Sequence, residues 1–303
     1  MSGDFREHLS VDTLPVAVVV VTWNSAAEID RCIRAALAQN PSEIVVVDNA
    51  STDQTLEIIQ GYASVKVLRQ HDNIGFCQAN NLGFAATTAP YVLALNADAF
   101  LEPGYLAGLV AVMDNMPEVA SAAGKLVYER NAQRYIDSTG IALQRWKLNP
   151  YDVGHAELDR GQYDTGRFAF GVSAAAALYR RSALDDLQEV FDEELFAYYE
   201  DVDLAWRLGR CGFKHYYEPS ALAYHDRRGP DSKPKAIAAR AFRNRYLVWL
   251  RNESPWRFMS YGPLALMWEV GRIVRRALSQ PATLSEIPSV LPLLKKMLAK
   301  RGR

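Results

Sequence analysis

The sequence predicts an α/β fold in which helices flank a mostly parallel sheet and a helical extension follows. First, short runs of strand character alternate with helical periodicity from residue 14 to about residue 116. Second, the strand runs are almost wholly apolar, which is typical of strands buried on both faces of a parallel sheet. Third, amphipathic helices replace this alternation after residue 230. We therefore expect one domain over residues 14–230 and a helical extension over residues 231–303.

The first half of the chain contains the clearest alternation. Residues 16–21 are nearly all β-branched and predict a buried first strand. Ser51 or Thr52 is expected to cap the helix that follows the second strand. The predicted elements are strands over 16–21, 43–47, 65–68 and 91–95, and helices over 26–39, 51–61 and 76–86. This β-α-β order implies right-handed crossovers and a parallel sheet.

The second half is less regular. Residues 149–166 are rich in Asp, Gly and Tyr and predict a mobile loop over the site. Helices are expected over 106–116, from residue 180 onward, and from about residue 199 to residue 209 or 212. Strands are expected over 168–179 and 214–217. Residues 126–128 and 135–143 are expected to be strand or loop. The extension is expected to hold helices over 235–252 and 260–278 and a basic amphipathic end over 291–303.

Composition excludes several classes of protein. The 303 residues carry a formal net charge of −1, so no global basic field indicates a nucleic-acid partner. Cys32, Cys77 and Cys211 lie far apart, which argues against a disulfide framework and a structural zinc site. The N-terminal decapeptide is polar and mixed in charge, so we do not expect it to be a signal peptide. We expect a cytoplasmic enzyme.

The usual phosphate-binding motifs of parallel sheets are missing. No G-x-G-x-x-G follows the first strand, and no G-x-x-x-x-G-K-[ST] occurs anywhere in the sequence. The first turn has polar side chains, Thr22-Trp23-Asn24-Ser25, where a dinucleotide-binding fold needs glycines. A dehydrogenase or P-loop enzyme is therefore not expected.

Two acidic stretches are candidates for chemistry. Asn96 and Asp98 follow the strand 91–95, where open α/β sheets bind ligands, and a carboxylate there suits a divalent cation. The alternative is that both residues only cap a turn. Further on, Glu200, Asp201 and Asp203 open a helix, where acids also serve as simple dipole partners. Asp203 points away from Asp201, and we expect it to pair with Arg207.

Several motifs together resemble one family. In order they are VVTWNS, VVDNASTD, NIGFCQANNLG, LNADAFLEPG, FDEELFAYYEDVDLAWRLGRCGF and YHDRRG. They are similar to those of inverting glycosyltransferases of family 2, which have the GT-A fold, and within it to the rhamnosyltransferase-like branch that builds bacterial surface polysaccharides. The resemblance makes 14–230 a GT-A catalytic domain. It implies sugar transfer from a nucleoside-diphosphate sugar to a hydroxyl of a glycan or lipid-linked acceptor.

The resemblance also assigns roles. Asp201 would be the catalytic base, with its neighbour Glu200 as the rival, while Asp98 and His225 would hold a divalent cation, Mn²⁺ or Mg²⁺. The nucleotide-sugar pocket would be lined by Thr22, Asn24, Asp48, Asn73, Gly75 and Asn96. The sequence departs from the family where Asn96 replaces the first aspartate of D-x-D. It also has Ala174-Ala175 where the branch usually has Gly-Ala.

Several alternatives stay open from the sequence. A nucleotidyltransferase that makes a nucleotide sugar would share the sheet, and a non-catalytic sugar- or lipid-binding scaffold would keep the fold. The donor is expected to be a dTDP- or UDP-sugar, with rhamnose favoured by the resemblance. The C-terminal helices either dock on the catalytic domain or make a peripheral contact with the inner face of the membrane; a solvated basic face is the simpler interpretation of their Lys and Arg residues.

Overall fold

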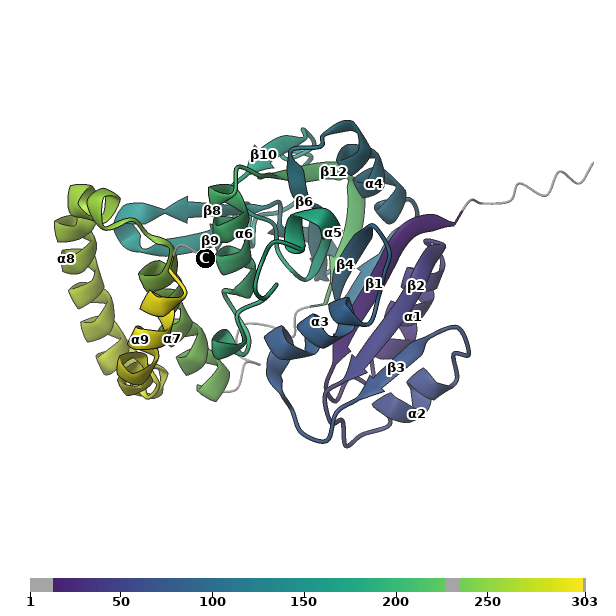
Figure 1. Ribbon diagram of the computed structural model, residues 1–303, viewed down its shortest axis with the longest axis horizontal. Coiled ribbons are helices and arrows are strands. Elements are labelled where there is room, and N and C mark those ends of the chain that lie inside the picture. The colour runs from purple at the N-terminus through teal and green to yellow at the C-terminus, as the bar shows by residue number, and fades with distance from the viewer. Residues whose placement is uncertain (1–12, 227–234, 302–303) are drawn as a thin grey trace, which may run out of the picture.

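The computed structural model describes residues 13–226 and 235–301. The N-terminal decapeptide and residues 227–229 of the YHDRRG motif lie outside the described residues. One large mixed sheet crosses the molecule, with helices on both of its faces and three further helices grouped at one end (Figure 1).

The strands of the large sheet have the spatial order β10-β12-β6-β11-β4-β1-β2-β3, while β5 pairs with β12 and β7 with β6. Their bounds, together with the separate hairpin β8-β9, are β1 (Leu14–Thr22), β2 (Pro41–Asp48), β3 (Lys66–Arg69), β4 (Tyr91–Asn96), β5 (Ala99–Leu101), β6 (Val119–Arg130), β7 (Gln133–Ser138), β8 (Ile141–Gln144), β9 (Asn149–Asp152), β10 (Arg167–Ala169), β11 (Ala176–Arg180) and β12 (Lys214–His225).

The helices alternate with these strands in the first half of the chain and follow them in the second. Their bounds are α1 (Ile29–Leu37), α2 (Thr55–Gln60), α3 (Gly75–Ala85), α4 (Tyr105–Asn115), α5 (Arg181–Leu184), α6 (Glu200–Arg210), α7 (Lys235–Asn252), α8 (Pro255–Ser279) and α9 (Val290–Ala299), with short 3₁₀ turns that include η1 (Arg145–Lys147) and η2 (Glu193–Leu195).

The predicted parallel sheet is confirmed for the first four alternating strands. Strand β1 pairs in parallel with both β2 and β4, and β2 pairs in parallel with β3. Val18 and Val19, on opposite faces of β1, are both fully buried, each in a different hydrophobic cluster. Helix α3 approaches so closely that a Cβ at Gly83 would lie 2.2 Å from the Val19 side chain. Burial on both faces explains why the central residues of β1 are all apolar.

The structure corrects the predicted strands of the second half. The strand predicted over 214–217 runs on to His225, and the one predicted over 168–179 is two strands, β10 and β11, on different neighbours. The loop predicted over 149–166 begins as strand β9. It also contains Asp159, which is buried against Lys125 at 3.3 Å. The ends of these strands depend on pairing with strands that are distant in sequence. A local sequence pattern carries no information about such pairing.

The predicted cap of α2 is also wrong. The Asp53 side chain, rather than Ser51 or Thr52, accepts the backbone N–H of Thr55 at 3.0 Å. The hydroxyl of Ser51 is engaged elsewhere, because it accepts the N–H of Asn24 at 2.9 Å. The turn after β2 is thus tied to the turn after β1.

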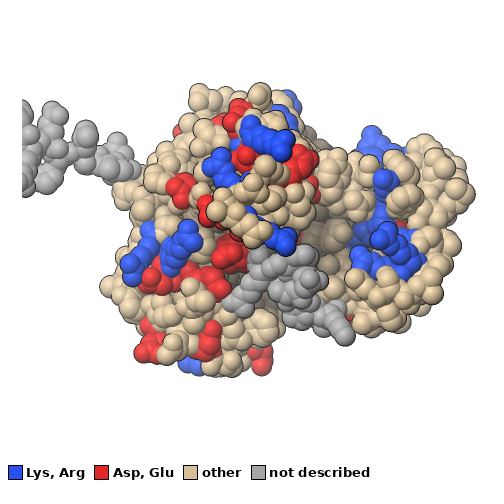
Figure 2. All heavy atoms as spheres, turned by 180° about the vertical axis from the view of Figure 1, so that it is seen from behind, with Lys and Arg blue, Asp and Glu red and all other residues tan. Residues whose placement is uncertain are grey.

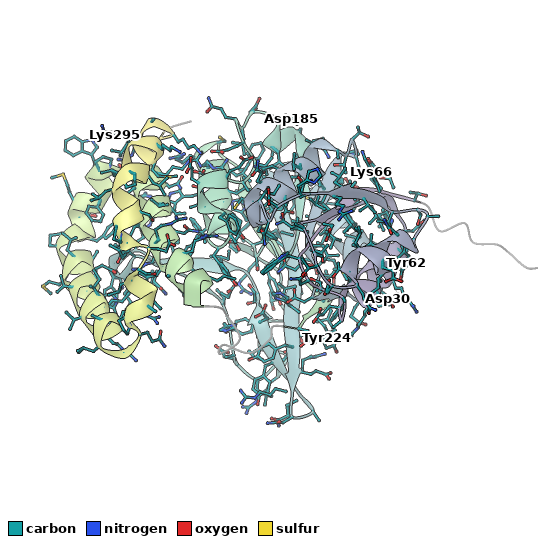
Figure 3. The ribbon with its side chains drawn as sticks, turned by 90° about the horizontal axis from the view of Figure 1, so that it is seen from below. Asp30, Tyr62, Lys66, Asp185, Tyr224 and Lys295 are labelled. Atoms are coloured by element: carbon teal, nitrogen blue, oxygen red, sulfur yellow. The ribbon has the colours of Figure 1, made fainter. Side chains whose placement is uncertain are left out.

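The C-terminal helices pack on the part of the molecule that contains the large sheet through α7, whose bounds match the predicted 235–252. Trp249 of α7 meets Trp206 of α6 edge to face at 4.9 Å between ring centroids. Leu247, Val248 and Trp249 lie in the same buried cluster as the second face of the sheet. Helix α8 lies at the outer end of the molecule, away from α1–α3 (Figures 1 and 3). None of the helices in the described ranges is long and apolar enough to cross a bilayer.

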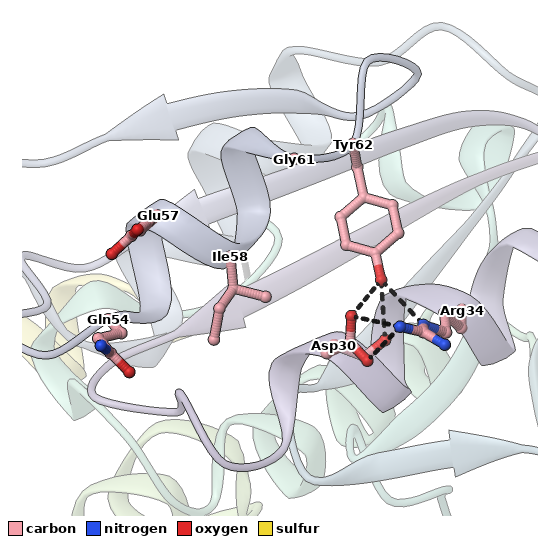
Figure 4. A pocket seen from close by; sticks show the side chains of 7 residues that line it. All are labelled: Asp30, Arg34, Gln54, Glu57, Ile58, Gly61 and Tyr62. Atoms are coloured by element: carbon pink, nitrogen blue, oxygen red, sulfur yellow. Dashed lines mark hydrogen bonds and ion pairs between the residues drawn. The ribbon is translucent and has the colours of Figure 1, made fainter.

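A surface hollow of about 650 Å³ lies between α1 and α2 (Figure 4). Within it the Tyr62 hydroxyl donates to Asp30, which also pairs with Arg34 at 3.0 Å. Its lining residues are Asp30, Arg34, Gln54, Glu57, Ile58, Gly61 and Tyr62. None of these residues belongs to the predicted site. The hollow lies between two helices that cover the sheet.

Candidate active site

Thr22 and Asp48 end adjacent parallel strands and are directly paired in register. Asp48 is fully buried and Thr22 nearly so. Neither carboxyl oxygen of Asp48, nor the Thr22 hydroxyl, has a hydrogen-bond partner among the described residues. Buried polar atoms are normally satisfied, so this pair of strand ends is suited to receiving an N–H donor from a ligand.

Two loops close around Asp48, and the predicted residues hold them in shape. The side-chain oxygen of Asn24 accepts the backbone N–H of Thr52 at 2.8 Å. The side-chain oxygen of Asn73 accepts from the Asn49 amide and from the backbone N–H of Gly75, both at 3.0 Å. Asn24, Asn73 and Gly75 therefore build the walls of this corner.

Gly75 occupies a position that only glycine fits. Its φ is +88°, and a Cβ there would lie 2.5 Å from the Phe196 ring. The loop after β3 is thereby pressed against the segment that precedes α6. Asn49, which the sequence analysis did not single out, supports the same loop by accepting the backbone N–H of Ile74 at 2.9 Å.

Asp98 and His225, predicted to share a cation, lie together. Their Oδ1 and Nε2 atoms are 3.3 Å apart, and the Asn96 amide nitrogen lies 3.3 Å from the same Nε2. The pairing of β12 with β5 produces this contact, because it sets His225 opposite Ala99. A carboxylate oxygen beside an imidazole nitrogen is a donor set that suits Mn²⁺.

Asp137 completes this arrangement and was not predicted. It is fully buried at the end of β7, and its Oδ2 lies 2.8 Å from Nδ1 of His225. Burial lowers the pKa of His225, but the hydrogen bonds to Asp137 and Asp98 outweigh it and raise the pKa to about 9. Within the described ranges no group of three or more His, Cys, Asp or Glu side chains forms a cation site. A cation here would take its remaining ligands from substrate and water.

Glu200 and Asp201, the predicted catalytic pair, open α6 with different environments. Asp201 Oδ2 lies 3.4 Å from the backbone nitrogen of Ala174, and its Oδ1 accepts the N–H of Val202 at 2.8 Å. Glu200 is buried, and burial together with the charge of Asp201 raises its pKa to about 8. This raised pKa favours the protonated form of Glu200, and Asp201 stays the predicted base.

A continuous set of contacts joins Asp201, of the predicted catalytic pair, to the Asp98–His225 pair. Asp201 contacts Ala174, and the next residue, Ala175, accepts the backbone N–H of Asn96 through its carbonyl at 2.9 Å. The Asn96 side chain in turn reaches His225. The two acidic stretches, about one hundred residues apart in sequence, thus meet at one edge of the sheet.

The backbone leading into α6 adopts left-handed conformations that are rare for bulky residues. Phe196, Tyr198 and Tyr199 have φ of 64°, 70° and 71°. The side-chain amide of Asn244, on α7, donates to the carbonyls of Leu195, Ala197 and Tyr198 at 2.8, 2.9 and 2.9 Å. Sequence reasoning missed Asn244, because an Asn within an amphipathic helix carries no local signal of this role.

Asp203 lies on the far side of α6 from this edge. Its carboxylate accepts from Arg207 at 2.7 Å, which confirms the predicted pair, and also from Asn252 at 2.6 Å. Burial raises the pKa of Asp203, but the charges of Arg207 and Arg251 lower it by more, so the net shift of the pKa is downward. Asp203 is a structural residue that binds α6 to α7.

Comparisons with known proteins agree with this architecture. Residues 17–188, more than half of the chain, match the profile of Glycosyl transferase family 2. The chain is 29% identical over 288 residues to the N-acetylglucosaminyl-diphospho-decaprenol L-rhamnosyltransferase of Mycobacterium tuberculosis, covering 84% of this chain and 91% of the relative.

Two solved structures share the fold. The crystal structure of GalNAc-T7 with UDP, GalNAc and Mn²⁺ matches with a TM-score of 0.63 and 18% identity, over 80% of this chain and 48% of that one. The mannosyltransferase PcManGT of Pyrobaculum calidifontis, in complex with GDP-Man and Mn²⁺, matches with a TM-score of 0.57 and 18% identity, over 96% of this chain and 84% of that one. With the sequence match to the family, these findings show that the chain belongs to glycosyl transferase family 2 and has the GT-A fold.

Proposed function

We propose that this protein transfers a sugar, with inversion, from a nucleoside-diphosphate sugar to a hydroxyl of a lipid-linked acceptor in the synthesis of a bacterial surface polysaccharide. The observation that carries the proposal is the set of contacts that joins Asp201 to Asp98 and His225. Such a transfer needs a base for the acceptor and a separate site for the leaving diphosphate, and this edge offers a candidate for each.

Asp48 and Thr22 are the groups we assign to the nucleobase. Uracil and thymine each present one N–H beside carbonyl oxygens, and the buried acceptor atoms of Asp48 suit that donor. Asn24, Asn73 and Gly75 shape the surrounding loops, and Asn96 lies between this corner and His225. A dTDP- or UDP-sugar is therefore the expected donor, with rhamnose favoured by the mycobacterial relative.

Asp98 and His225 are the residues that would hold a divalent cation, Mn²⁺ or Mg²⁺. When bound, such a cation would offset the negative charge that develops on the departing diphosphate. The chain's own contribution is orientation, since the contact with Asp137 fixes the His225 ring with Nε2 toward Asp98. Only a neutral imidazole ligates a metal, so a cation would take the place of the proton on Nε2.

Asp201 is the proposed general base. It accepts the proton of the acceptor hydroxyl while that oxygen bonds to the anomeric carbon and the bond from this carbon to the diphosphate breaks. Attack from the face opposite the diphosphate inverts the configuration. Glu200 stays protonated beside Asp201 and is not expected to take part as a base.

The acceptor is inferred from the relative, whose name specifies a sugar on a decaprenyl diphosphate. A lipid-linked acceptor would place the enzyme at the inner face of a membrane. We retain residues 14–230 as the catalytic unit and 231–303 as an extension that both holds the catalytic turn through Asn244 and faces outward through α8.

The test is a panel of UDP-, dTDP- and GDP-sugars, assayed for stabilisation of the protein and for slow hydrolysis, with and without Mn²⁺. A sugar transferase should bind and hydrolyse one donor class in a Mn²⁺-dependent manner. Synthesis of a nucleotide sugar from a nucleoside triphosphate and a sugar phosphate would instead indicate a nucleotidyltransferase. Binding with no turnover, even with lipid-linked acceptors, would indicate a scaffold.

A further inference from the structure

Helix α8 has the reverse of the polarity expected for a helix on a soluble protein. The side chains on its buried side include Glu269, which accepts from Arg245 at 2.6 Å and from Tyr246 at 2.5 Å. Arg272 is also turned inward and donates to the carbonyl of Lys147 at 2.6 Å. Two of the five charged side chains of α8, Glu269 and Arg272, are thus engaged with the rest of the protein.

The outward side of α8 is apolar. At 3.6 residues per turn, roughly two thirds of the helix circumference lacks any charged side chain, with Arg257 and Arg275 at one border. The exposed apolar residues on this helix, each between 38% and 83% accessible, are Trp256, Met259, Leu264, Leu266, Met267, Trp268, Val270, Ile273, Val274 and Leu278. Apolar patches of this extent mark an interaction surface.

The charge around this surface has one sign. Residues 235–301 contain thirteen Lys or Arg residues and three Glu residues, although the whole chain has a net charge of −1. The three glutamates are engaged by arginines: Glu253 by Arg145, Glu269 by Arg245, and Glu286 by Arg243 at 3.6 Å. In Figure 2, where this part lies at the right, the surface is mostly uncharged with basic patches and little acidic area.

We infer that the outward face of α8 lies on an anionic lipid bilayer, with the helix parallel to the membrane plane. An apolar helical face bordered by arginines, with a tryptophan, matches the chemistry of interfacial helices. A second copy of the chain is the competing occupant. A symmetric dimer through this face would oppose two strongly basic surfaces, whereas anionic headgroups neutralise them.

This inference rests on the proposed function for its purpose, because a lipid-linked acceptor is presented at a membrane surface. The two can fail separately. Vesicle binding is measured without substrate, and donor hydrolysis is measured without lipid. Loss of one with retention of the other identifies which idea is wrong.

The experiment uses the full-length protein and vesicles of phosphatidylcholine, alone or mixed with phosphatidylglycerol, in a flotation assay. The variant Met267→Asp/Val270→Asp places two charges on the outward face, where both native side chains are more than 60% exposed and folding should persist. Met267→Leu/Val270→Leu is the matched control. We expect binding to anionic vesicles to fall about tenfold or more in the aspartate variant and to stay unchanged in the control.

Two further readouts complete the test. Arg257→Glu/Arg275→Glu should remove the preference for anionic vesicles, and brominated acyl chains should quench tryptophan fluorescence less in Trp256→Phe than in the native protein. Equal flotation of the aspartate variant and the native protein would overturn the inference. So would a dimer, detected by light scattering, that the aspartate variant dissociates, because that result assigns the face to self-association.

Discussion

The amide nitrogen of Asn244 lies 2.9 Å from the carbonyl oxygen of Tyr198, three residues before Asp201. Asn244 belongs to α7 of the C-terminal extension, whereas Tyr198 precedes α6, which carries the proposed base Asp201. Tyr198 has φ of 70°, and the same amide holds two neighbouring carbonyls. The extension therefore supports the conformation in which Asp201 is presented.

Replacing Asn244 by Leu should lower turnover more than donor affinity. The substitution removes hydrogen bonds from three carbonyls and is expected to cost about 1–3 kcal/mol of stability. Asn252→Leu, on the same helix but bonded to Asp203, is the control for general destabilisation. The kcat of both variants should be measured well below their Tm, with donor affinity by calorimetry. Equal loss of kcat in the two variants would reduce Asn244 to a packing role.

The second prediction concerns cation binding by Asp98, His225 and Asp137. Asp98→Ala should abolish Mn²⁺ binding, and His225→Ala should weaken it more modestly. Asp137→Asn should weaken it about 10–100-fold, because the His225 ring loses the partner that orients it. Mn²⁺ affinity measured by electron paramagnetic resonance needs no turnover. Asp185→Asn, at an exposed position directly after α5, is the control (Figure 3). An unchanged Mn²⁺ titration in the His225 variant would make His225 a packed, hydrogen-bonded residue.

The third prediction concerns Asp48 and the nucleobase. Asp48→Asn keeps the size of the side chain but replaces one acceptor oxygen with a donor, which meets the N–H of uracil or thymine unfavourably. Affinity for UDP or dTDP should fall about tenfold or more, while Mn²⁺ affinity stays unchanged. Titration calorimetry of UDP or dTDP with the native protein and with Asp48→Asn measures this loss of affinity. Native affinity in Asp48→Asn would remove Asp48 from the nucleotide site.

The fourth prediction is a pH dependence of stability caused by Glu200. Its pKa rises from 4.5 to about 8 on folding, so between these values the folded state holds a proton that the unfolded state has lost. The free energy of unfolding should then decrease as pH rises from about 5 to 8, by at most about 1.4 kcal/mol per pH unit. Glu200→Gln removes this term and should flatten the profile of Tm against pH. Glu129→Gln, on the exposed β6–β7 hairpin, should keep the native slope.

Sequence patterns predicted the regular part of this structure well. The alternating apolar runs predict β1 to β4, because the central residues of β1, β2 and β4 are buried and each run is followed by a helical pattern. The pairing of Asp203 with Arg207 was equally accessible, since it lies within one turn of helix. Local spacing is sufficient for features of this kind.

The remaining features depend on contacts between distant segments. Asp137 reaches His225 across 88 residues, and only the pairing of β6 with β7 and β12 brings them together. Asn244 is 46 residues from Tyr198 and looks like an ordinary polar position of α7. The outward apolar face of α8 is recognisable only once its inward partners are known.

The central claim is that Asp201 is the general base and Glu200 is not. Each carboxyl can be replaced by its amide, which keeps the shape and removes the basicity. The single-turnover rate of sugar transfer, measured at saturating donor, should fall about 10²–10⁴-fold in Asp201→Asn, with donor affinity and Tm near native. Glu200→Gln should retain most of the rate, since the raised pKa of Glu200 favours its protonated form. Near-native transfer by Asp201→Asn together with a dead Glu200→Gln would contradict this assignment, and full activity of both variants would place the base elsewhere.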